Sequence, residues 1–301
     1  LGPKEADLAI SKWNPFTQGS DPLFLPRSFS SEDISPDQEA EMLSLLKKSR
    51  SQLDKPTKDE KRSCAQHALL AKAWVDTGVA LANESLIHKA YNLLRWMDSV
   101  FRQPDGSVSS IRYPDQTTSR FCFLEDQAFW VEALLAMGTI SEIYKLGNLE
   151  TWITKAEEHL LHTVEKFKDP TLPGFFSCPD GFEDSGPTRK KSWYDHAMPS
   201  GNSSLIRCFH TLGQIGKNKE KWNAEYREAL AAYPKLAKAS PDGIGHALCS
   251  LTEAAVGVIT IQGPHLGLRE IAYEMRQLSY RPIFFVERSE EHTSELQSPD
   301  H

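Results

Sequence analysis

The sequence lacks the features that would place the protein on a nucleic acid or in a membrane. It has no concentrated stripe of lysine and arginine, and its net charge is −7 at pH 7, so a nucleic-acid-binding surface is not expected. The basic stretch at residues 188–191 is short and lies in a predicted loop, where a solvated charge run is the better interpretation. No apolar run approaches the roughly 20 residues that a membrane-spanning helix needs. We therefore predict neither a nucleic-acid partner nor a membrane partner.

Paired cysteines are absent as well. The five cysteines are odd in number, lie far apart and never form a C-x-x-C pair. This pattern is typical of reduced thiols that fill the core of a cytosolic protein, and it argues against a zinc site. The sequence also has no phosphate-binding glycine loop and no H-E-x-x-H motif. We expect no metal, no cofactor and a cytoplasmic location, with Cys122, beside two carboxylates, as a candidate reactive thiol.

Both ends of the chain look incomplete. The sequence has no signal peptide and starts at Leu1 rather than Met, so we expect the true N-terminus to be missing, with any targeting segment it carried. Residues 1–36 are rich in proline, serine and aromatic residues and indicate an irregular leading segment. Residues 288–301 lose all hydrophobic periodicity and resemble a translated sequencing adapter, so we exclude them from the fold. Residues 37–287 are left as the folded domain.

Helices dominate this domain. Residues 150–167 have the clearest helical pattern, with one apolar stripe every three to four residues. Another helix begins at residue 36, where Ser35 precedes a proline and acidic residues. Further helices are predicted at 62–82, 85–101, 124–146, 203–216, 219–238, 243–256 and 265–279. Runs of β-branched and aromatic residues predict short strands at 256–263 and 282–287, on either side of the last helix.

Two long connections indicate how the helices are organised. Each follows a helix that ends in phenylalanine and a basic residue, at Phe101-Arg102 and at Phe167-Lys168, which is a weak internal repeat of about 65 residues. Loops longer than roughly 12–15 residues are functional or disordered in compact domains, and the aromatic content here argues against disorder. Helical hairpins whose long connections recur on one side predict a mainly all-α fold, an α/α toroid with these loops around its central cavity.

Two motifs lie where these connections enter new helices. Residues 124–129 read Leu-Glu-Asp-Gln-Ala-Phe, and residues 195–203 read Asp-His-Ala-Met-Pro-Ser-Gly-Asn-Ser. They resemble the Leu-x-Asp-Tyr-Ala-Phe and Asp-x-Ala-x-Pro-Ser-Gly-Asn-Ser motifs of thioredoxin-domain-containing proteins similar to spermatogenesis-associated protein 20. Between them, residues 173–177 resemble the Gly-Gly-Phe-Phe turn of that family. The resemblance covers roughly residues 40–287.

The resemblance implies a fold and an activity. The helical region of that family belongs with the six-hairpin glycosidases and the N-acylglucosamine 2-epimerase-like toroids, so a sugar ligand and a carbohydrate-active enzyme, either glycoside hydrolase or sugar epimerase, are expected. About nine predicted helices fall short of six hairpins, so a truncated toroid is expected, without the upstream thioredoxin-like domain of the family. The Trp-Asn-Gly segment of the family is replaced by Cys-Ala-Gln-His at 64–67. A non-catalytic helical module is the alternative.

The carboxylates of the two motifs are candidate catalytic groups. Glu125 and Asp126 are adjacent, about 100° apart on a helix, so one can face the cavity while the other caps the helix start. Asp195 occupies the equivalent place one repeat later, and glycoside chemistry needs two carboxyl groups about 5–10 Å apart. Asp126 and Asp195 are therefore the predicted acid–base pair, with Glu125 and His196 as further candidates. Helix capping is the structural alternative for these carboxylates.

Aromatic and polar side chains beside these carboxylates suit a sugar. Its C–H faces stack on rings and its hydroxyl groups need hydrogen-bond partners. The predicted sugar-binding residues are Trp193, Tyr194, Ser200, Asn202, Phe123 and His67. A structural role, capping of the following helix by Ser200 or Asn202, is the alternative. His246 lies near a predicted helix start, as His67 does, whereas His88, His159 and His162 are expected at the surface.

Overall fold

The computed structural model describes residues 2–4, 35–55, 57–182, 189–263, 265–278 and 283–287. The chain divides into two compact units, Leu1–Asp59 and Glu60–His301. The adapter-like tail and most of the irregular leading segment lie outside the described residues. In the first unit, α2 (Pro36–Ser51) begins as predicted, because Ser35 and Gln38 cap each other's backbone N–H groups.

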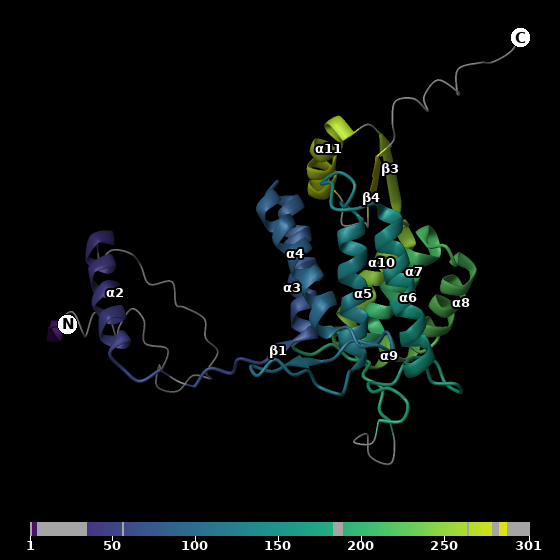
Figure 1. Ribbon diagram of the computed structural model, residues 1–301, viewed down its shortest axis with the longest axis horizontal. Coiled ribbons are helices and arrows are strands. Elements are labelled where there is room, and N and C mark those ends of the chain that lie inside the picture. Colours follow the sequence, from purple (N-terminus) through teal and green to yellow (C-terminus); the bar gives the residue numbers. More distant parts are fainter. Residues whose placement is uncertain are drawn as a thin grey trace, which may run out of the picture. The chain divides into compact units, whose positions relative to one another are not determined.

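The helices of the second unit form hairpins in two layers (Figure 1). The inner helices α3, α5, α7 and α10 (Gly245–Val256) pack side by side in this order, and each of α4, α6 and α8 packs outside its partner. The hairpins are α3 (Cys64–Ala80) with α4 (Glu84–Phe101), α5 (Leu124–Gly138) with α6 (Leu149–Phe167), and α7 (Gly201–Ile215) with α8 (Lys219–Leu230). This inner and outer layering confirms the predicted α/α toroid, of which the described residues hold three hairpins and α10.

Burial differs between the two layers. Nearly every residue of α5 is buried, because α5 contacts α3, α6 and α7. The outer helix α4 buries only one face, which includes Ile87, Leu94 and Met97. A close approach between α5 and α7 requires Gly201, since a Cβ atom there would lie 2.8 Å from Cγ of Leu124. This contact brings the two sequence motifs together.

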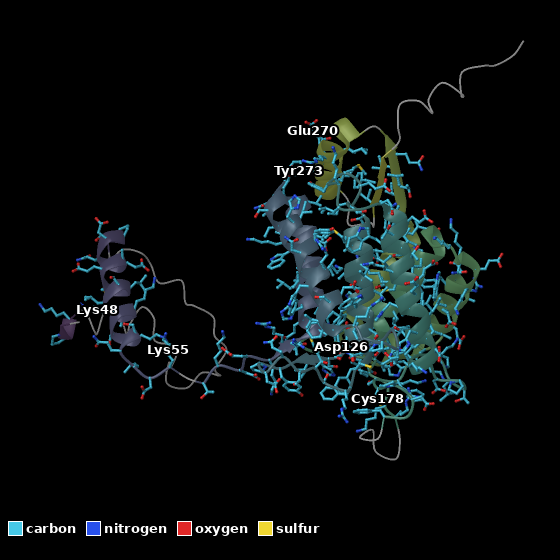
Figure 2. The ribbon with its side chains drawn as sticks, in the orientation of Figure 1. Lys48, Lys55, Asp126, Cys178, Glu270 and Tyr273 are labelled. Atoms are coloured by element: carbon cyan, nitrogen blue, oxygen red, sulfur yellow. The ribbon has the colours of Figure 1, made fainter. Side chains whose placement is uncertain are left out.

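The long connections gather at the end of the bundle where α3, α5 and α7 begin (Figure 1). The internal repeat is visible there, because Arg102 bridges to Val108 and Lys168 bridges to Phe175 directly after α4 and α6. Two short antiparallel strands that the sequence did not predict, β1 (Arg62–Ser63) and β2 (Ile111–Arg112), lie at the same end. Figure 2 shows that Asp126 and Cys178 belong to this end.

Two predicted helices differ from the structure by more than two residues at an end. The helix predicted at 124–146 ends at Gly138, and the chain turns through residues 139–146, with a positive φ of 55° at Lys145. The helix predicted at 219–238 divides into α8 and α9 (Tyr233–Ala239). Pro234 lies at the start of α9, where its missing N–H group costs nothing, whereas it would break the interior of a continuous helix.

The predicted exposure of histidines and cysteines is only partly right. The surface prediction for His159 is wrong, since this side chain is 1% exposed and stacks on Trp130 between α6 and α5. The core prediction for the cysteines is confirmed for four of the five. The buried thiols are those of Cys64, Cys122, Cys178 and Cys208, and Cys249 is exposed.

The predicted strand–helix–strand element is confirmed. It consists of β3 (Ile259–Gly263), α11 (His265–Leu278) and β4 (Ile283–Glu287), with the two strands parallel. The element contacts the inner helices, because α11 packs on α3 and the N–H group of Phe285 donates to the carbonyl of Thr139 at 3.1 Å. Among the described residues, no helix combines the length and the apolar character that crossing a membrane requires.

Candidate functional site

Asp126 lies at the meeting point of α3, α5 and the connection between α4 and α5. Its carboxylate accepts hydrogen bonds from the backbone N–H groups of Phe123 at 3.0 Å and Ala65 at 3.1 Å, and from the hydroxyl group of Ser110. Burial raises the pKa of Asp126, and these three hydrogen bonds oppose that rise. The contacts are those of a carboxylate that caps two helix starts. A catalytic role for Asp126 stays a prediction.

Glu125 lies where the starts of α5 and α7 approach each other. One of its oxygens is 3.4 Å from the N–H group of Gly201, so this carboxylate lies near the positive end of the α7 dipole. Burial raises the pKa of Glu125, and the hydrogen bond from Gly201 is among the contacts that oppose the rise. A catalytic role for Glu125 likewise stays a prediction.

Asp195 connects α7 with α10. Its two carboxylate oxygens accept from the N–H groups of Ser200 and His246, each at 2.8 Å. Its own N–H group donates to the carbonyl of Gly243 at 2.7 Å. Asp126 and Asp195 therefore bind different segments, and in the described part of the chain they share no hydrogen-bond partner. Their action as one acid–base pair stays a prediction.

The predicted sugar-binding residues Trp193, Ser200 and Asn202 each contact another part of the fold. Asn202 binds the turn at 173–177, because its amide accepts from Phe175 N–H at 2.8 Å and donates to the Phe175 carbonyl at 2.9 Å. Ser200 caps α7 by accepting from Ser203 N–H at 3.1 Å. Trp193 meets Tyr233 edge to face, with ring centroids 5.7 Å apart. These contacts give the three residues structural roles. Sugar binding by them stays a prediction.

The other predicted site residues differ in exposure and in the rings that they contact. His196 is exposed in a turn, and Phe123 is 38% exposed and packs against Phe121 and Phe182. The ring of His67 packs against Trp96 and Phe101 of α4 instead of the second motif. The structure therefore gathers the two motifs but gives His67 different neighbours.

Cys122 does not have the environment of a reactive thiol. Burial, together with the negative charge of Asp126, raises the pKa of Cys122 to about 12. A thiol with this pKa stays protonated at neutral pH and is a poor nucleophile, so the reactive-thiol hypothesis is wrong. In the part of the chain that the structure describes, no group of three or more histidine, cysteine or acidic side chains is arranged to hold a metal ion.

A group of charged residues that sequence analysis missed lies deeper between the inner helices. Glu132 of α5 is 4% exposed, and its carboxylate is 3.0 Å from Nε2 of His246 at the start of α10. Arg207 of α7 lies 3.9 Å from the other carboxylate oxygen of Glu132 and donates to Glu253 of α10 at 2.6 Å. Three inner helices thus supply two carboxylates, an imidazole and a guanidinium to one place.

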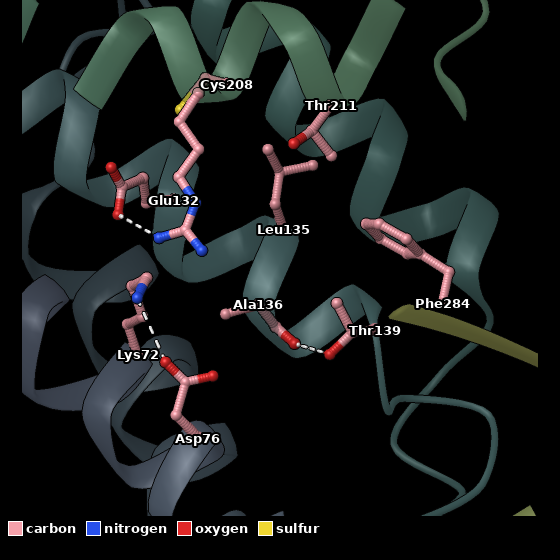
Figure 3. Close-up of a pocket in the computed structure, with 10 residues that line it drawn as sticks. Lys72, Asp76, Glu132, Leu135, Ala136, Thr139, Cys208, Thr211 and Phe284 are labelled. Atoms are coloured by element: carbon pink, nitrogen blue, oxygen red, sulfur yellow. Dashed lines mark hydrogen bonds and ion pairs between the residues drawn. The ribbon is translucent and has the colours of Figure 1, made fainter. Parts of the chain in front are cut away.

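Glu132 and Arg207 of this group line a pocket of about 40 Å³ that is partly open to solvent (Figure 3). Figure 3 shows the Lys72–Asp76 ion pair of α3 on one side and Phe284 of β4 on the other. The lining residues are Lys72, Asp76, Glu132, Leu135, Ala136, Thr139, Arg207, Cys208, Thr211 and Phe284. The pocket therefore combines four charged groups and two hydroxyl groups with an apolar wall.

The two carboxylates that contact Arg207 have opposite pKa shifts. Burial would raise the pKa of Glu132, but the hydrogen bond from His246 and the charges of His246 and Arg207 lower it to about 2. For Glu253 burial prevails, and its pKa is raised above the ordinary value. Carboxyl groups whose environments push their pKa values apart are suited to separate acid and base roles.

The sequence carried a signal for this pocket. Glu132 is the single charged residue within 127–138, in a segment apolar enough to be buried on all sides. Burying an unpaired carboxylate is costly, so a lone glutamate in such a helix requires a partner elsewhere in the fold. The partner, His246, is 114 positions away, and the helical pattern does not identify it.

The pocket makes the stability of the protein sensitive to acid. Because the pKa of Glu132 is lowered from about 4.5 to about 2 on folding, its ionised form stabilises the folded chain above the unfolded pKa, and this contribution is lost as pH falls through about 2. Denaturant unfolding of the wild type and the Glu132→Gln variant measures it. The difference between their free energies of unfolding is expected to shrink below about pH 4.5. A constant difference would contradict the assignment.

Comparisons with known proteins find similarity in overall structure alone. No protein-family model matches the chain, and no curated protein matches it. Cellobiose 2-epimerase from Spirochaeta thermophila is similar at 16% identity and a TM-score of 0.46, over 59% of this chain and 44% of that chain. A family 105 glycoside hydrolase from C. acetobutylicum is similar at 12% identity and a TM-score of 0.46, over 65% and 57%. A GH76 alpha-mannanase from Bacteroides thetaiotaomicron is similar at 18% identity and a TM-score of 0.44, over 58% and 46%.

The similarity covers less than two thirds of each of these solved structures. The chain spans 44%, 57% and 46% of the three, in the order named. The activities of these longer proteins therefore come to this chain only as a proposal.

Proposed function

We propose that the protein is a carbohydrate-active enzyme that works by acid–base chemistry, as a glycoside hydrolase or a sugar epimerase, and that its site is the pocket between the inner helices. The observation that carries the proposal is the contact between Glu132, which lines the pocket, and His246, 3.0 Å long. Proton transfer by a positioned side chain requires this kind of pair within reach of a ligand.

Each wall of the pocket has a part in binding a sugar. Glu132, with a pKa of about 2, is ionised at neutral pH and is able to accept a proton or stabilise positive charge. Arg207 and Lys72 supply hydrogen-bond donors for hydroxyl groups. Leu135 and Phe284 supply an apolar surface on which the C–H face of a sugar ring packs.

The two reaction types use different partners of Glu132. A glycoside hydrolase needs a second carboxyl group as proton donor, and Glu253, whose pKa is raised by burial, is the candidate that the group around Arg207 offers. A sugar epimerase needs two groups that exchange a proton with one carbon atom, and Glu132 with His246 would supply them. The motif carboxylates, Asp126 and Asp195, are a second candidate location for the same chemistry.

A non-catalytic helical module is the second candidate function. It is favoured by the pairing of the charged groups, since Lys72 contacts Asp76 and Arg207 contacts Glu253. Asp126 and Asp195 also accept hydrogen bonds from backbone N–H groups, as structural carboxylates do. In such a module the pocket would bind no sugar.

A binding and turnover screen with a pocket-filling variant tests the proposal. The chain is titrated with neutral, amino and acidic monosaccharides and with disaccharides, and binding is measured by calorimetry and turnover by chromatography of the products. Ala136→Phe fills the pocket and is expected to weaken binding at least 10-fold, because Ala136 lines its wall. Ala255→Phe places the same bulk on the exposed face of α10 and is the matched control.

The outcomes separate the two functions. Binding that Ala136→Phe removes and Ala255→Phe preserves supports the enzyme. Binding that both variants preserve would place the sugar outside the pocket and contradict this site. Absence of binding and turnover across the whole panel would favour the non-catalytic module.

A further inference from the structure

We propose that Asp195 is a positioning residue, whose carboxylate fixes the first turn of α10 and thereby holds the imidazole of His246 against Glu132. The inference deepens the proposed function and depends on it only for the effect on turnover. The positioning itself is a property of the ligand-free chain. It assigns to the second motif a role in building the pocket, although the motif residues do not line it.

The start of α10 has no cap of its own. Its N-cap residue is Ile244, which makes no side-chain hydrogen bond to the exposed N–H groups. A helix start normally receives such a bond from a serine, threonine, aspartate or asparagine. Asp195, 51 positions earlier in the chain, supplies it by accepting from the N–H group of His246 at 2.8 Å. The cap of α10 therefore comes from the second motif.

Tyr194 and Asp195 also contact Gly243, which precedes α10 in the chain. The Asp195 N–H group donates to the Gly243 carbonyl at 2.7 Å. Tyr194 packs so closely on Gly243 that a Cβ atom there would lie 2.8 Å from the tyrosine ring. The segment before His246 is thus fixed both by hydrogen bonds and by packing, and glycine is required at 243 for the contact.

The residue that Asp195 caps is also the residue that contacts Glu132 of the pocket. His246 is the second residue of α10, so its backbone N–H group binds Asp195 while its Nε2 atom lies 3.0 Å from Glu132. The other carboxylate oxygen of Asp195 accepts from Ser200 N–H at the start of α7, the helix that carries Arg207. One carboxylate therefore aligns the two helices whose side chains hold Glu132 in its ionised form.

The positioning is measured by the titration of Glu132, followed by carboxyl ¹³C NMR of glutamate-labelled protein. The Glu132 signal is identified by its absence in the Glu132→Gln variant. In Asp195→Ala the pKa of Glu132 is expected to rise by at least one unit, because the hydrogen bond from His246 is lost. In Asp195→Asn, which retains one acceptor oxygen, a smaller rise is expected.

Asp169→Ala is the matched control. Asp169 also accepts from two backbone N–H groups, those of Thr171 and Leu172, but its bonds lie outside α10. The pKa of Glu132 is expected to stay at its wild-type value in this variant.

The folding and the Glu132 titration of the Asp195 variants together test the positioning role. If the Asp195 variants fold and leave the titration of Glu132 unchanged, Asp195 does not position His246. Where Asp195→Ala fails to fold, Asp195→Asn carries the test, and if both fail, Asp195 supports the whole fold and the specific role is overturned. A wild-type chain that binds no sugar while the titration shifts as expected would refute the proposed function and leave the positioning intact.

Discussion

Replacing Glu132 by glutamine is expected to reduce turnover of a sugar substrate by about 10²–10⁴-fold, the usual contribution of a positioned acid–base group. Glutamine has nearly the same shape and keeps a hydrogen bond to His246, but it neither accepts a proton nor carries negative charge. Because Arg207 retains Glu253 as a partner at 2.6 Å, the pocket is expected to keep its form. Steady-state kinetics on the substrate found in the sugar screen measure the effect.

The control and the stability of the variant make this prediction specific. Glu158→Gln removes a carboxylate from the exposed face of α6 and is expected to change kcat/KM by less than about twofold, since no contact with the pocket is lost. Circular dichroism verifies that both variants are folded. A folded Glu132→Gln variant with wild-type kcat/KM would show that Glu132 is not the acid–base group of the reaction.

Replacing Asp126 by alanine is expected to lower the free energy of unfolding by about 3–5 kcal/mol, because three hydrogen-bond donors lose their acceptor inside the protein. These donors are the N–H groups of Phe123 and Ala65 and the hydroxyl group of Ser110. Each buried donor left without a partner costs about 1–3 kcal/mol, and the costs are not fully additive. Chemical denaturation at neutral pH measures the change.

An exposed carboxylate provides the comparison for Asp126. Asp98 forms ion pairs with Arg102 and Lys155 on the outer helices, and each of these side chains is about one third exposed or more. Asp98→Ala is expected to cost less than about 1 kcal/mol, as partly exposed ion pairs do. A loss of about 1 kcal/mol or less for Asp126→Ala would contradict the view that this residue ties α3 and α5 together.

Local sequence patterns predicted the outer helices well. The helices predicted at 85–101 and 150–167 begin within one residue of α4 and α6 and end with them. Such helices bury one face only, so their apolar residues recur every three to four positions. Their starts are also locally encoded, because Asn83 and Asn148 cap α4 and α6.

The inner helices were harder to delimit from sequence. A helix that is apolar on all sides has no polar face to mark its length, and the apolar pattern around Ile140 and Ile143 continues beyond the end of α5 at Gly138. The turn after Gly138 is stabilised by tertiary contacts. One of them is the hydrogen bond from the N–H group of Phe285 in β4 to the carbonyl of Thr139. A residue 146 positions away cannot be paired with Thr139 from the helical pattern.

The sequence by itself determined the helical class, the alternation of hairpins with long connections, and the two motifs at helix starts, because each depends on residues close together in the chain. Only the tertiary structure decided what the motif carboxylates bind and where the charged pocket lies. Asp195 reaches His246 across 51 positions, and Glu132 reaches His246 across 114. Periodicity encodes burial, but it does not specify which distant polar group satisfies a buried carboxylate.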